Sequence, residues 1–116
     1  FVPDVAGWKR ERFPVGLKGH KLTVAPDWVC EISSKSTRAR DQVLKSPLYA
    51  RAGIQWMWLI EPIDCRIDVF ENNQGRWSFV SEHIGHVRAR IQPFDAVEID
   101  LGEWWSTPPS DAAAEP

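Results

Sequence analysis

The chain has no long apolar segment and very little cysteine. None of its apolar runs approaches the roughly eighteen residues that a membrane-spanning helix needs, and none reads as a secretory signal. Its two cysteines, Cys30 and Cys65, fall in segments with strand character. One disulfide would be conceivable, but nothing else resembles a secreted, disulfide-rich scaffold. We therefore expect reduced thiols in a cytoplasmic protein that has no membrane partner.

Cysteine and histidine are also too sparse to build a zinc site. His83 and His86 are three residues apart, and no Cys or His completes a ligand set around them. The length of 116 residues, 43% hydrophobic content and net charge of −2 are ordinary for a single globular domain. We expect that domain to span residues 1–105. Residues 106–116, rich in Pro, Ala and Ser, are expected to form a disordered tail.

Charge is distributed unevenly along the chain. Residues 1–51 contain ten Lys or Arg against five Asp or Glu, a net charge of +5, whereas residues 52–116 contain four against eleven, a net charge of −7. A basic first half is compatible with a polyanionic partner. An uneven surface without such a partner is an equally good explanation of the charges alone.

The order of local patterns predicts a mixed α/β sheet. Residues 1–6 read as the end of a strand, 7–26 as a long polar loop, and 27–32 as a strand. Helical spacing follows from 37 to 52, although Pro47 would kink that helix, and 55–60 reads as a strand buried on both faces. This strand–helix–strand unit predicts a right-handed crossover between parallel strands.

The second half of the chain predicts an antiparallel extension of the same sheet. Residues 66–70 and 76–80 alternate in polarity around the turn-forming sequence Asn72-Asn73-Gln74-Gly75. Further strands are expected near 87–91 and 97–101, where they would complete the sheet.

Two carboxylates, Asp4 and Glu31, are the strongest candidates for metal ligands. Asp27 shares a strand face with Glu31, but four residues of strand separate the two by about 13 Å, too far to share one ion. Asp4 is expected on a separate strand, which can bring it beside Glu31. Glu31 lies within an apolar strand, where a lone charge is costly to bury without a metal or a partner. Carboxylates and waters are the ligands that suit Mg²⁺.

Hydrolysis of a phosphodiester also requires positive charge near the phosphate, and two lysines are candidates. Lys35 shares the alternating face of Glu31 and Ser33 if the strand continues that far. Lys45 is expected on the crossover helix, which packs over the sheet. An ordinary ion pair between Lys45 and Asp41 one helical turn earlier is the structural alternative.

Taken together, these motifs resemble the PD-(D/E)XK nuclease superfamily, and within it the restriction endonuclease branch known as domain of unknown function 820. The segments that carry the resemblance are Pro3-Asp4-Val5-Ala6-Gly7-Trp8, Pro26-Asp27-Trp28-Val29-Cys30-Glu31-Ile32-Ser33-Ser34-Lys35-Ser36-Thr37, Asp41-x-x-x-Lys45-x-x-x-Tyr49-Ala50-x-x-Gly53 and Trp58-Leu59-Ile60-Glu61-Pro62. The resemblance extends from Phe1 to about Trp105, and its combined spacing is specific although each piece alone is weak.

The resemblance implies a restriction-endonuclease-like fold and a metal held by Asp4 and Glu31. It also implies a catalytic lysine displaced from the strand to the helix, which matches Lys45, because Ser33 occupies the usual strand position. Lys35 stands where this branch often has proline, so it is the weaker candidate. The implied activity is Mg²⁺-dependent hydrolysis of DNA by a metal-activated water, with Mn²⁺ as a substitute and the phosphate left on the 5′ side.

Several other side chains are candidates for secondary roles. Asp27 is one of them, although a strand-entry residue that bonds nearby backbone is the favoured interpretation. Ser33 and Ser34 would cap the following helix or contact phosphate, and capping is favoured. Tyr49 is expected to be a core or rim aromatic with a hydrogen-bonded hydroxyl. Nucleic-acid contacts are considered for an aromatic and basic set comprising Trp8, Lys9, Arg10, Arg38 and Arg40.

The chain begins two residues before Pro3, whereas the superfamily core has a helix and a strand before that motif. We therefore expect an N-terminally truncated domain, and its own activity is an open question. A homodimer would explain how one small site cuts two strands. The rival hypotheses are a catalytically silent nuclease fold that binds nucleic acid or protein, and a structural domain in which Glu31 pairs with Lys45.

Overall fold

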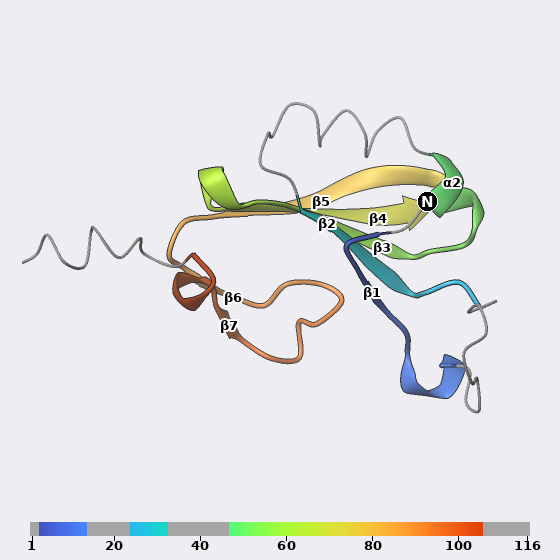
Figure 1. Cartoon of the computed structure of the whole chain (residues 1–116), viewed down its shortest axis with the longest axis horizontal. Coiled ribbons are helices and arrows are strands. Elements are labelled where there is room, and N and C mark those ends of the chain that lie inside the picture. The colour runs from blue at the N-terminus through green and yellow to red at the C-terminus, as the bar shows by residue number, and fades with distance from the viewer. Residues whose placement is uncertain (1–2, 14–23, 33–46, 106–116) are drawn as a thin grey trace, which may run out of the picture.

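A five-stranded mixed sheet organises the protein, as a computed structural model of the chain shows (Figure 1). The structure describes residues 3–13, 24–32 and 47–105. The strands lie in chain order: β1 (Val5–Gly7), β2 (Trp28–Ile32), β3 (Trp56–Glu61), β4 (Arg66–Asn73) and β5 (Arg76–Ile84). Strands β2 and β3 are parallel and every other neighbouring pair is antiparallel. The predicted parallel pairing and the mixed sheet are therefore confirmed. Residues 37–46 of the predicted crossover helix lie outside the described residues.

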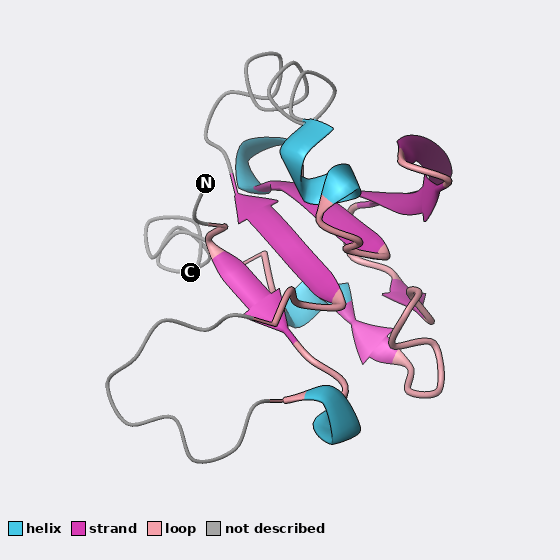
Figure 2. Ribbon diagram, turned by 90° about the vertical axis from the view of Figure 1, so that its right-hand side faces the viewer, coloured by secondary structure: helices cyan, strands magenta, loops and turns pink. Residues whose placement is uncertain are grey.

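The two faces of this sheet are covered by different elements (Figures 1 and 2). Helix α2 (Pro47–Arg51) packs on one face, over Val29, Met57 and Leu59. The opposite face is covered by a second, two-stranded sheet of β6 (Arg88–Ala89) and β7 (Ile99–Asp100). The apolar core on this side of the main sheet includes Cys30, Trp58, Ile60, Ile67, Val69, Ile91, Leu101 and Trp105. Strand β3 is buried on both faces, as its unbroken apolar sequence predicted.

The predicted continuation of the main sheet after β5 is wrong. Strands β6 and β7 are two residues each and pair with one another instead of adding to β5. Ile91 and Leu101, which flank them, are fully buried against the large apolar face that contains Trp58. Covering that face removes more apolar surface from water than extending the sheet edge would, which explains the arrangement.

The β4–β5 hairpin turns where the sequence predicted, and its turn anchors α2. Gln74 and Gly75 have φ of 55° and 88°, as two-residue hairpin turns of the mirror-image type require. The Asn72 side chain accepts a hydrogen bond from Gly75 N at 2.8 Å and donates to Ala50 O at 3.0 Å and Ile54 O at 2.8 Å. This one amide therefore joins the hairpin to the end of α2.

Three short 3₁₀ helices complete the described elements: η1 (Arg10–Arg12), η2 (Pro62–Asp64) and η3 (Leu101–Glu103). Cys65 follows η2 with a φ of 51°, so it does not lie in a strand as predicted. Cys30 and Cys65 are free thiols. In the described ranges, no helix has both the length and the apolar character needed to cross a membrane.

Candidate metal centre

Strand pairing brings the two predicted metal ligands together. Asp4 immediately precedes β1, whose first pair is Val5 with Cys30, so Asp4 lies beside Glu31 and Ile32 at the end of β2. The sequence placed Asp4 at the end of its strand, whereas it lies at the beginning, and the antiparallel pairing still makes the carboxylates neighbours. Asp4 Oδ2 accepts a hydrogen bond from Ile32 N at 2.7 Å, which fixes one oxygen against β2.

Glu31 is half-buried on the face of the sheet that α2 covers. Its oxygen Oε2 accepts a hydrogen bond at 2.7 Å from the hydroxyl of Tyr49, a buried residue of α2. Burial is the main cause that raises the pKa of Glu31 and the Asp4 charge raises it further, while the Tyr49 bond acts in the opposite direction. A cation between the two carboxylates would offset both unfavourable contributions.

Neighbouring ionisable groups respond to the same pair of charges. The pKa of the Cys30 thiol is raised to about 12, mainly by burial and further by Asp4 and Glu31. Burial and Glu31 also raise the pKa of Tyr49, so its hydroxyl keeps its proton and acts as a donor to Glu31. Cys30 is consequently a neutral, buried core residue at physiological pH and not a thiolate nucleophile.

Tyr49 is the residue whose role the sequence reasoning left open. It was expected to be a core or rim aromatic with a hydrogen-bonded hydroxyl, but its partner was unknown. The spacing Asp41-x-x-x-Lys45-x-x-x-Tyr49 carried the signal, because residues four apart share one face of a helix. A helix that lies over β2 can therefore bring that face to Glu31.

Several candidates lie outside the described residues: Ser33, Ser34, Lys35, Arg38, Arg40 and Lys45, together with the tail 106–116. The described part of the chain contains no group of three or more His, Cys, Asp or Glu arranged to hold a metal. The predicted ligands that lie within the described residues, Asp4 and Glu31, form a pair of neighbouring carboxylates. Asp68, another buried carboxylate, is accounted for by its ion pair with Arg66, with Oδ1 3.0 Å from Nε.

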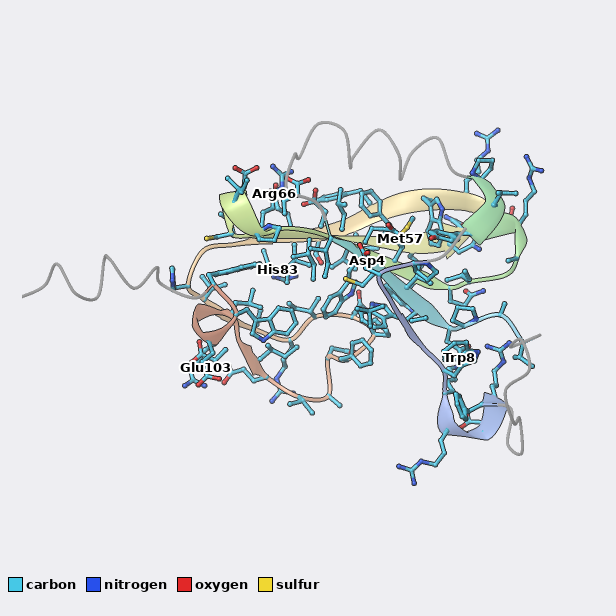
Figure 3. All side chains as sticks on the ribbon, viewed as in Figure 1. Asp4, Trp8, Met57, Arg66, His83 and Glu103 are labelled. Atoms are coloured by element: carbon cyan, nitrogen blue, oxygen red, sulfur yellow. The ribbon has the colours of Figure 1, made fainter. Side chains whose placement is uncertain are left out.

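Asp27 lies at the opposite end of β2 and holds a loop. Its carboxylate accepts a hydrogen bond from Lys9 N at 2.7 Å and forms a short ion pair with Arg12. Trp8 is fixed nearby, because its indole N–H donates to Val24 O at 2.9 Å and its ring contacts Phe13 edge-on. Figure 3 shows Trp8 beside η1, well separated from Asp4. The candidate ligands and these candidate DNA-contacting residues thus occupy different ends of β1 and β2.

Comparisons with known proteins bear directly on this arrangement. The family model Uma2, described as "Putative restriction endonuclease", matches residues 1–102. The chain belongs to this family. The resemblance stated from the motifs is thereby confirmed.

A solved structure adds evidence for the fold of this Uma2 chain. It is described as a "putative nuclease belonging to DUF820" from Anabaena variabilis ATCC 29413. The TM-score is 0.64 at 23% sequence identity, over 91% of this chain and 62% of that one, so the present chain spans less than two thirds of this relative. The likeness confirms the restriction-endonuclease-like α/β fold. No curated protein matches the chain.

Proposed function

We propose that this Uma2-family protein is a metal-dependent DNA endonuclease in which Asp4 and Glu31 bind Mg²⁺, with Mn²⁺ as a substitute. The observation that carries the proposal is the pairing of β1 with β2, which sets the Asp4 carboxylate beside Glu31. Two neighbouring negative charges, one of them partly desolvated, repel each other unless a cation lies near them. The proposed site therefore explains an otherwise unfavourable arrangement.

The donors present fit the proposed ion. Mg²⁺ binds oxygen ligands, often only one or two carboxylates, and takes waters and substrate phosphate oxygens for the remainder. When bound, such an ion supplies positive charge at the phosphate and lowers the pKa of a coordinated water. The thiol of Cys30 does not compete, because Cys30 packs into the core on the opposite face of β2 from Glu31.

The chain's own residues have separable roles in this proposal. Tyr49 holds Glu31 through Oε2, and Ile32 N holds Asp4 through Oδ2, so each carboxylate keeps its second oxygen for the ion. Lys45, assigned from the family resemblance, would balance the charge that develops on the phosphate, with Lys35 and Ser33 as secondary candidates. Trp8, Lys9 and Arg10 would contact DNA away from the bond that is cut.

A plasmid-nicking assay tests the two carboxylates. We expect Asp4→Asn and Glu31→Gln each to lower Mg²⁺-dependent nicking by more than about 100-fold, because loss of a residue that merely orients a metal ligand already costs about 10- to 100-fold. Glu103→Gln is the matched control, since Glu103 is an exposed carboxylate of η3 that Figure 3 shows far from Asp4. Undiminished nicking by both variants would refute the assignment.

Calorimetry separates the enzyme from a silent nuclease fold. Saturable Mn²⁺ binding by the wild-type protein, lost in Glu31→Gln, is the expected result. DNA binding with no Mn²⁺ binding would instead favour a nucleic-acid-binding module without catalytic activity.

A further inference from the structure

A cavity of about 360 Å³ lies at the other end of β1 and β2 from Asp4 and Glu31. Four of its nine lining residues are aromatic, namely Trp8, Trp28, Trp56 and Phe94, and its charged lining residues are Lys9 and Asp27. Its volume is near the lower limit for small-molecule sites, which run from about 300 to 1,000 Å³. A single small, flat group therefore matches this space better than an extended ligand.

The rings around the cavity are held in fixed orientations. Trp28 contacts both Trp58 and Phe94 edge-on, with ring centroids 5.2 and 5.1 Å apart. Gly7 allows Trp28 to lie close against β1, because a Cβ at residue 7 would be 3.1 Å from Trp28 Cε3. Phe94 comes from the loop between β6 and β7 and is 43% exposed, so part of its ring remains available to a ligand.

The polar groups of the cavity are complementary to a nucleotide. The Lys9 side chain is exposed, and its backbone N–H, not its ammonium group, makes the bond to Asp27. Arg10 follows it in η1 and is exposed as well. The indole N–H of Trp28 is buried and has no acceptor within the described ranges. The phosphate of a nucleotide bound in the cavity would meet the two cations, and its base would meet the rings of Trp28 and Phe94.

We propose that this cavity binds one unpaired nucleobase of the DNA substrate, stacked against its aromatic walls. The inference rests on DNA being the partner, as in the proposed function. Asp4 lies three residues before Gly7, about 10 Å along the edge of the described sheet. One DNA molecule that follows this edge can therefore reach both sites, although they lie on opposite faces of the sheet. The substrate class is accordingly DNA that contains an unpaired or extruded base.

The test uses hairpin DNA that carries 2-aminopurine either as a single unpaired base or in a base pair, with the full chain in EDTA so that no cleavage occurs. Stacking against the cavity rings should quench the fluorescence of the unpaired base, whereas the paired base, already quenched by stacking within the duplex, should not change on binding. One stacked base typically changes affinity by about 5- to 150-fold, and we expect a preference for unpaired DNA in this range.

Two phenylalanines provide the matched variants. Phe94→Ala should abolish most of the quenching and of the preference, whereas Phe79→Ala should retain both, because Phe79 is 56% exposed but lies on β5 outside the cavity. Lys9→Gln is a second variant for the case in which Phe94→Ala does not fold, because it changes only an exposed side chain. It should weaken binding of both DNAs and reduce the salt dependence by about one phosphate contact.

Equal affinity of the wild-type protein for paired and unpaired DNA, without quenching, would overturn the inference and assign the cavity to an apolar protein segment. The inference also fails if Phe79→Ala loses the quenching and the preference as Phe94→Ala does. Quenching by a wild-type protein that cuts no DNA in Mg²⁺ or Mn²⁺ would support this inference and refute the proposed nuclease. Cleavage without quenching would do the reverse.

Discussion

The two ends of β2 present opposite chemistry on opposite faces of one short strand. Glu31, near the end of the strand, faces α2 and lies beside Asp4, in a setting dominated by carboxylates. Trp28, at its beginning, faces the β6–β7 side and lies among aromatic rings. Because successive residues of a strand point to opposite faces, five residues can serve both settings without either disturbing the other. Separate substitutions should therefore separate the two sites.

Among the changes that separate the two ends of β2 without altering a proposed metal ligand, the largest effect is expected from Tyr49→Phe, which removes the hydroxyl that holds Glu31. The ring can stay in the core, so the fold should persist. Mn²⁺ affinity and nicking should both fall by about 10- to 100-fold, as for other residues that orient metal ligands. Quenching of unpaired 2-aminopurine should not change. Metal affinity equal to that of the wild-type protein would show that Tyr49 serves packing alone.

A smaller effect, at the other end of β2, is expected from Asp27→Asn. The carboxylate holds Lys9 N and Arg12, and the change weakens both bonds without altering side-chain size. We expect a loss of about 1 kcal/mol in the free energy of unfolding, measured by urea denaturation, together with weaker quenching of 2-aminopurine. Mn²⁺ affinity should remain that of the wild-type protein. If Asp27→Asn also lowered Mn²⁺ affinity, the two ends of β2 would be energetically coupled, contrary to this prediction.

The smallest effect is a pH dependence of stability that arises from Glu31. Because the pKa of Glu31 is raised in the folded state, the fold binds this proton more tightly than the unfolded chain does. The resulting stability is complete below the ordinary pKa of glutamate and is lost as pH rises through the folded-state pKa. Without metal, the melting temperature of Glu31→Gln should therefore rise relative to that of the wild-type protein as the pH increases above about 4, the ordinary pKa of glutamate.

Saturating Mg²⁺ should reverse this difference, because only the wild-type carboxylate pair binds the ion. A gap between the two melting temperatures that is independent of pH would mean that Glu31 titrates alike in the folded and unfolded states.

Local patterns were sufficient to predict much of the sheet. Alternation in residues 27–32 correctly separated Trp28 and Cys30 from Val29 and Glu31, because a period of two residues is a property of the strand itself. The unbroken apolar run of β3 likewise indicated burial on both faces. The parallel pairing followed from the length of the connection between β2 and β3.

Contacts between distant segments were beyond such reasoning. Phe94 reaches Trp28 across 66 positions of sequence, and no periodicity in either segment encodes that contact. The separate β6–β7 sheet was missed for the same reason, because its position depends on the apolar face that Ile91 and Leu101 cover. The roles of Asp4, Glu31 and Lys45 remain predictions, although strand pairing does set Asp4 beside Glu31.

The Asn72 side chain, which joins the hairpin to the end of α2, has a consequence for the order of folding. Tyr49 is adjacent to Ala50, whose carbonyl Asn72 binds, so the position of the hydroxyl that meets Glu31 depends on a turn more than twenty residues later in the chain. Such non-local contacts form only after the intervening loop has closed. During synthesis, Tyr49 can therefore take up its position beside Glu31 only after the β4–β5 hairpin has left the ribosome. A nascent chain that stops before this hairpin would lack the contact that fixes the end of α2.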